Sequence, residues 1–177
     1  RLSADEIQAL IQRLQSHPEG PRAELSRLRN EYSQLENDLH IWANNPPRVH
    51  PETHAVLSPQ EKTAEIQNRR LFREKILRCW RKETDLFDAL QGAEYGYTLK
   101  FSEPILGEFP ALSADFSHIS MLSLEGSNAA RATDPFLERF PGLRRLEMRN
   151  FVLRNVPQAI STMPALDELV LSDCGIA

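Results

Sequence analysis

The sequence lacks the features that mark several large classes of protein. Its 177 residues include only two cysteines, Cys79 and Cys174, which lie far apart and argue against a disulfide framework or a zinc site. No stretch approaches the roughly 18 apolar residues of a membrane span, so we do not expect a membrane partner. The 21 basic and 25 acidic residues give a net charge of −4, and therefore no global positive field for nucleic acid. There is no glycine-rich phosphate loop or nucleotide fingerprint, so we predict no cofactor.

The composition that remains is typical of a folded domain. Apolar residues make up 41% of the chain and charged residues 26%, which leaves enough apolar surface for a core. The length is close to that of one domain of about 150 residues. Because the chain starts at Arg1 without methionine and stops inside a repeating pattern, we expect it to be a piece of a longer protein.

The first half has the sequence patterns of helices. Residues 3–16 begin with capping-box spacing and carry apolar residues at helical intervals. Residues 25–42 repeat apolar side chains at steps of three and four, and residues 58–90 open with a serine cap followed by proline. Each apolar stripe needs a partner, so we predict an antiparallel helical bundle over residues 1–92.

In the second half the apolar period changes. The pattern Leu-x-x-Leu-x-Leu recurs at steps of 23, 24 and 23 residues, aligning Leu99, Leu122, Leu146 and Leu169. Such steps are typical of leucine-rich repeats, in which short strands and returning segments stack into a solenoid. We therefore predict an α+β fold, in which the bundle caps a solenoid of three to four repeats over residues 93–177, truncated at its C-terminus.

Three stretches carry a resemblance to a known family. They are Leu77-Arg78-Cys79-Trp80, residues 112–118 (Leu-Ser-Ala-Asp-Phe-Ser-His) and residues 136–146 (Phe-Leu-Glu-Arg-Phe-Pro-Gly-Leu-Arg-Arg-Leu). Residues 58 to 177 thereby resemble the region that precedes and enters the leucine-rich repeats of large pseudomonad toxin-like effectors. Those effectors are related to the IpaH/SspH group of secreted bacterial ubiquitin ligases. Plant-pathogen effectors with helices, repeats and a different ligase domain fit the same general plan.

The resemblance implies a part of a secreted bacterial protein that acts in the host cytoplasm. In that family the ligase domain follows the repeats and carries a Cys-x-Asp nucleophile motif. Neither Cys79 nor Cys174 matches that motif. The implied role of this chain is therefore substrate recognition or regulation without catalysis, and its partner is a host protein or a downstream domain of the parent chain.

The binding site is expected on the exposed positions of the predicted strands, which would form the concave face of the solenoid. The candidate partner-binding residues are Lys100, Ser123, Glu125, Arg144, Arg145, Glu147, Arg149, Glu168 and Val170. The third strand is rich in arginine and the fourth is acidic, so a partner would meet adjacent opposite charges. The alternative is that these residues are solvated and pair across neighbouring strands.

Two other functions stay open at this point. An enzymatic or toxin activity could reside in the helical half, around His50, Glu52 and His54, although Pro51 disfavours the helix that a His-Glu-x-x-His zinc site needs. Seven basic residues within 69–82 could instead contact phosphates or an acidic lipid surface, or the bundle could mediate self-association. Acidic residues interrupt that basic run, which favours an ordinary solvated helix face.

Overall fold

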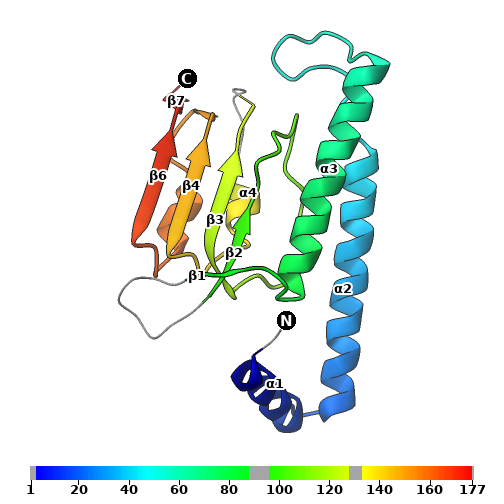
Figure 1. Ribbon diagram of the computed structural model, residues 1–177, viewed down its shortest axis with the longest axis vertical. Helices are drawn as coiled ribbons and strands as arrows, with labels where there is room; N and C mark the ends of the chain where they lie inside the picture. Colours follow the sequence, from blue (N-terminus) through cyan, green and yellow to red (C-terminus); the bar gives the residue numbers. More distant parts are fainter. Residues whose placement is uncertain (1–2, 88–95, 128–132, 177) are drawn as a thin grey trace.

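The computed structural model describes residues 3–87, 96–127 and 133–176 (Figure 1). Its helices are α1 (Ala4–Ser16), α2 (Pro21–Asn44), α3 (Pro59–Trp80) and the short α4 (Asp134–Leu137), with a 3-10 turn at Gln158–Thr162. Its strands are β1 (Leu86–Phe87), β2 (Gly96–Lys100), β3 (Ile119–Glu125), β4 (Arg145–Arg149), β5 (Val152–Leu153), β6 (Glu168–Ser172) and β7 (Gly175–Ile176). No helix among these residues is long and apolar enough to cross a membrane.

The predicted starts of the first and third helices are confirmed. Ser3 and Glu6 form a reciprocal capping box on α1, and Ser58 and Glu61 form another on α3. The predicted end of the third helix is wrong, because α3 stops at Trp80 and Leu86–Phe87 pair with β2 instead. Tertiary pairing overrides the helical pattern there.

The predicted antiparallel bundle of three helices is also wrong. The helices α2 and α3 lie side by side and run in opposite directions, whereas α1 turns away at the base of α2 (Figure 1). No residue of α1 is buried, and Ile7 and Ile11 on its apolar stripe remain 46% and 39% exposed. Gly20 makes this turn possible, because its φ of 89° lies in the left-handed region that favours glycine.

The strands form a five-stranded sheet in the order β1-β2-β3-β4-β6. Four of these strands are parallel, and β1 pairs antiparallel with β2 at one edge. Leu99, Leu122, Leu146 and Leu169 occupy the same register across the parallel strands. The second, two-stranded sheet pairs β5 with β7.

The predicted α+β class and leucine-rich-repeat solenoid are therefore wrong. The chain has an α/β fold, with helices first and a four-stranded parallel sheet after them. The described connections do not recur: irregular chain follows β2, α4 follows β3, and β5 with the 3-10 turn follows β4. The leucines recur every 23 or 24 residues because they lie at the same register position on neighbouring parallel strands. Connections of nearly equal length give this spacing without forming a solenoid.

One continuous core joins the helices to the sheet. The ring of Phe72 on α3 stacks on Phe101, just after β2, with centroids 3.7 Å apart, and also contacts Phe109 and Phe136. α4 and the 3-10 turn lie behind the sheet in the view of Figure 1. The predicted domain boundary at residues 92 and 93 lies outside the described residues.

A buried ion pair fixes the end of α2 against α3. Arg69 donates to Glu65 at 2.9 Å and to the carbonyl oxygens of Trp42 and Leu106, each at 2.8 Å. The backbone N–H of Leu106 in turn donates to Glu65 at 3.0 Å, and the Arg69 guanidinium lies 4.5 Å from the ring centroid of Trp42. This cluster ties two helices to the chain that leaves the sheet after β2.

Candidate functional site

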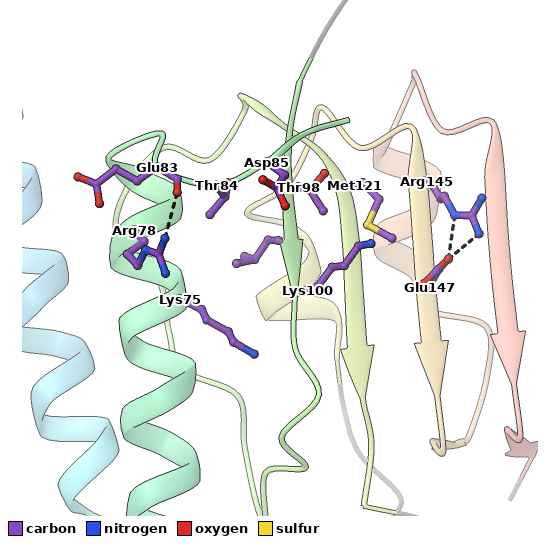
Figure 2. Close-up of a pocket in the computed structure, with 11 residues that line it drawn as sticks. Lys75, Arg78, Glu83, Thr84, Asp85, Thr98, Lys100, Met121, Arg145 and Glu147 are labelled. Carbon is purple, nitrogen blue, oxygen red and sulfur yellow. Dashed lines mark hydrogen bonds and ion pairs between the residues drawn. The ribbon is translucent and has the colours of Figure 1, made fainter. Parts of the chain in front are cut away.

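The face of the sheet opposite α4 carries polar side chains. Leu99, Leu122 and Leu146 point into the core and are buried, so their strand neighbours point the other way. We call this surface the open face, and its residues are Thr98, Lys100, Met121, Ser123, Glu125, Arg145, Glu147, Arg149, Glu168, Val170 and Ser172. Figure 2 shows side chains from β2, β3 and β4 on this side.

Eight of the nine predicted binding residues share this face. The exception is Arg144, which comes one residue before β4. Because side chains alternate along a strand, this position is on the side of the sheet away from the open face. Its guanidinium lies 3.7 Å from the carboxylate of Asp167. Ser123 is on the face but only 1% exposed, because Lys100 and Glu147 flank it in register.

Opposite charges on the open face pair with one another. Arg145 contacts Glu147 at 2.5 Å and Glu168 at 2.6 Å, while Arg149 contacts Glu125 at 3.0 Å. Burial on its own would raise the pKa of Glu147, but hydrogen bonds and charge from Arg145 lower that pKa overall. These contacts link β3, β4 and β6, as the alternative of cross-strand pairing predicts.

A pocket of about 660 Å³ lies where the open face meets the C-terminal end of α3. Lys75 and Arg78 enter it from α3, Asp85 from the segment before β1, and Lys100 from β2 (Figure 2). Lys75 is held by Glu103 at 2.9 Å, and Arg78 donates to the carbonyl oxygen of Glu83 at 3.4 Å. With Arg145 and Glu147 of β4, the pocket thus gathers cations and carboxylates from four parts of the chain.

Two charged side chains in this pocket stand apart from the network. In the part of the chain that the structure describes, neither the Lys100 ammonium nor the Asp85 carboxylate has a hydrogen-bond or ion-pair partner. Both are exposed, although the main-chain carbonyl of Asp85 accepts from the N–H of Thr98 at 2.8 Å. They are therefore free to meet charges supplied by another molecule.

The sequence reasoning missed the helical side of the pocket. Lys75 and Arg78 belong to the basic run of α3, which we interpreted as a solvated face. Their spacing of three residues places them on one side of the helix, and this was the available signal. Asp85 gave no signal of its own, because its position depends on the pairing of β1 with β2.

The cysteines have packing environments. Cys79 is fully buried, and burial raises the pKa of its thiol to about 12. The imidazole of His118 contacts the Cys79 carbonyl oxygen at 2.9 Å rather than the thiol. Cys174 is half-buried, with its sulfur 3.5 Å from the carbonyl oxygen of Met148. Cys79 therefore belongs to the hydrophobic core.

His50, Glu52 and His54 lie in the loop between α2 and α3. The N–H groups of Glu52 and Thr53 donate to the His50 imidazole at 3.2 and 3.3 Å, so this ring closes the loop. His54 has a φ of 58° and an exposed side chain. Within residues 3–87, 96–127 and 133–176 no cluster of histidine, cysteine or acidic residues is arranged to hold a metal ion.

A second pocket of about 480 Å³ lies between α1, α2 and the end of α3. Leu10, Leu28 and Trp80 supply its apolar lining. Its central carboxylate, Glu31, already accepts from Trp80 at 2.9 Å and from the N–H of Asp115 at 3.0 Å. The first pocket therefore has the greater capacity to engage a charged partner.

Comparisons of the chain with family models, with curated proteins and with solved structures found no match. The fold and site thus define the protein only as an α/β domain with a charged sheet face that no described element covers. The resemblance to secreted ubiquitin ligases stays a hypothesis.

Proposed function

We propose that this chain is a protein-binding module, and that the open face with its adjoining pocket is the surface that binds the partner. The observation that carries this proposal is that Lys100 and Asp85 have no charged or hydrogen-bonding partner among the described residues, beside a sheet face where Arg145 and Arg149 are held by Glu147 and Glu125. An exposed polar face by itself would not distinguish a binding surface from a solvated one.

The ion pairs on the open face hold side chains in place before a partner binds, and they add little to the binding free energy themselves. Exposed pairs of this kind stabilise a fold by about 0 to 1 kcal/mol. Arg145 and Arg149 are nevertheless already held by Glu147 and Glu125, so a partner does not have to immobilise them. Ordering a long side chain at an interface costs about 0.5 to 1.5 kcal/mol, and the network removes much of that penalty.

The chemistry of the pocket favours a partner segment with separated charges of both signs. A carboxylate from the partner would pair with Lys100 and Arg78, and a basic side chain would pair with Asp85. The resemblance described above supports a host protein or a downstream domain of a longer, secreted parent chain as the source of that segment. In this proposal the chain recognises its partner and catalyses no reaction.

Selection from a phage-displayed library of random peptides tests the proposal without knowledge of the natural partner. Enriched peptides should contain acidic and basic residues, and NMR shifts on binding should cluster at Lys100, Met121 and Arg145. Lys100→Glu should weaken binding about tenfold, which corresponds to about 1.4 kcal/mol. Arg154→Glu is the matched control, because Arg154 is exposed and lies outside the open face. Peptides that bind wild type and Lys100→Glu equally would contradict the proposal.

A further inference from the structure

β6 is an edge strand with an exposed apolar side. It comes last in the sheet order, after β4. Its residues Leu169 and Leu171 are 38% and 41% exposed, whereas their partners in register on β4, Leu146 and Met148, are fully buried. The same side of the sheet that forms the core therefore continues outward to an edge that no described residue covers.

The backbone of β6 presents groups along the same edge that have no partner among the described residues. The N–H of Glu168 donates to Arg144 and the carbonyl of Ser172 accepts from Asn150, so both residues face β4. In a parallel ladder alternate residues bond to opposite sides, so Leu169 and Leu171 direct their N–H and C=O groups away from β4. Such a row of groups is a template for a further strand.

Nothing within β6 blunts this template. Edge strands usually carry lysine, proline or a bulge that prevents pairing, but the sequence of β6 is Glu-Leu-Val-Leu-Ser and its register with β4 is continuous. The charges at the edge are acidic instead. Asp167, Glu168 and Asp173 are all exposed, and two of them also contact arginines at β4: Asp167 lies 3.7 Å from Arg144 and Glu168 lies 2.6 Å from Arg145.

These acidic residues disfavour a second copy of the chain as the added strand. An antiparallel pair of β6 strands centred on Val170 would place Asp167 opposite Asp173 at both ends. Like charges directly opposite each other destabilise a strand pair. In this register the acidic ends of the strand therefore favour a basic segment over a second copy, and such a segment would share Asp167 and Glu168 with Arg144 and Arg145.

We propose that the edge of β6 binds an extended segment of alternating apolar and basic residues, which adds to the sheet as a sixth strand beyond the five of the isolated chain. The apolar side chains of that segment would cover Leu169 and Leu171. Its basic side chains would lie on the other side, beside Glu168, with Asp167 and Asp173 near the two ends. This surface is separate from the pocket at Lys100, which lies toward the opposite edge of the sheet.

The probe is the peptide acetyl-Lys-Val-Lys-Val-Lys-Val-amide, and its control replaces each lysine with glutamate. Amide hydrogen exchange of the 177-residue chain is followed by NMR. The basic peptide should bind saturably and slow exchange at Leu169 and Leu171 at least about tenfold, because both amides gain hydrogen bonds. Binding without protection of these two amides, or equal binding of the acidic peptide, would overturn the proposal.

Two variants of matched charge separate the edge from general electrostatic attraction. Removing the acids at the edge with Asp167→Asn, Glu168→Gln and Asp173→Asn should weaken binding of the basic peptide about tenfold. The triple change Glu19→Gln, Glu36→Gln and Glu138→Gln removes the same charge from exposed sites elsewhere and should leave affinity unchanged. Equal losses in the two variants would overturn the proposal.

Two further measurements separate binding at the edge of β6 from binding at the open face and from self-association. Lys100→Glu should leave binding of the basic peptide intact, so failure of the proposed open-face function and failure of the edge can be told apart. Light scattering should show a monomer without peptide. A dimer whose interface protects Leu169 and Leu171 would show that the edge pairs with itself, contrary to the charge argument.

Discussion

The buried pair of Arg69 and Glu65 predicts a large effect from one substitution. In Arg69→Met the side chain keeps much of its volume but loses the guanidinium that contacts Glu65, Trp42 and Leu106. The side chains of Arg69 and Glu65 are only 4% and 3% exposed, so water cannot replace the lost contacts. Glu65 would stay buried but would lose its ion pair with Arg69.

Removing one partner of a buried pair destabilises a protein by about 3 to 5 kcal/mol. We expect the upper part of this range, because the change also leaves the carbonyl oxygens of Trp42 and Leu106 without their donor. A typical domain has a free energy of unfolding of about 5 to 15 kcal/mol, so the variant should lose a large fraction of its stability. Adding Glu65→Leu should recover about 1 to 3 kcal/mol, since it removes the buried carboxylate that lost its ion pair with Arg69.

Urea unfolding followed by tryptophan fluorescence and by far-ultraviolet circular dichroism measures both changes. The matched control is Arg70→Met, the adjacent position, where the side chain is exposed and donates a hydrogen bond to Asn44 at 3.2 Å. That control should change the free energy of unfolding by less than about 0.5 kcal/mol. A loss below about 1 kcal/mol in Arg69→Met, or no recovery in the double variant, would refute the reasoning.

Three further predictions concern single residues. Hydrogen bonds from Arg27 lower the pKa of Glu24 from 4.5 to about 2. The free energy of unfolding should therefore fall as the pH drops from 4.5 toward 2. Urea titrations of Glu24→Gln should lack this part of the pH dependence. Iodoacetamide at pH 8 should label Cys174 well before Cys79 by mass spectrometry, because Cys79 is buried with a thiol pKa of about 12; faster labelling of Cys79 would contradict its placement. Gly126→Ala should destabilise the fold by about 1 to 3 kcal/mol in thermal unfolding, since the added carbon would lie 2.2 Å from a backbone oxygen; an unchanged midpoint would contradict that packing.

Local signals in the sequence predicted local structure well. Ser3 and Ser58 set the starts of their helices through hydrogen bonds within one turn, so no knowledge of the fold was needed. The end of α3 was not predictable in this way. There Lys82 adopts a φ of 58° and the chain turns into β1, whose partner β2 begins at Gly96, beyond any local window.

The repeated leucines show that the spacing of apolar residues can place strands correctly while the fold inferred from that spacing is wrong. The steps between Leu99, Leu122, Leu146 and Leu169 correctly placed four strands in register. They did not reveal that Phe72 of α3 packs into the same core, or that the connections differ from one strand to the next. Alternation along each strand likewise predicted eight open-face residues, and it failed at Arg144 because the start of β4 is offset by one residue.

The ion pairs on the open face limit the binding free energy that a partner can gain there. A partner that inserts between Arg145 and Glu147 must break an existing contact, so the net gain from a new one is small. Lys100 and Asp85 have no such contact to lose among the described residues, and Arg78 has one weak contact. Specificity on this face should therefore depend on a few unpaired groups at the pocket, while the arginine and glutamate network sets the shape around them.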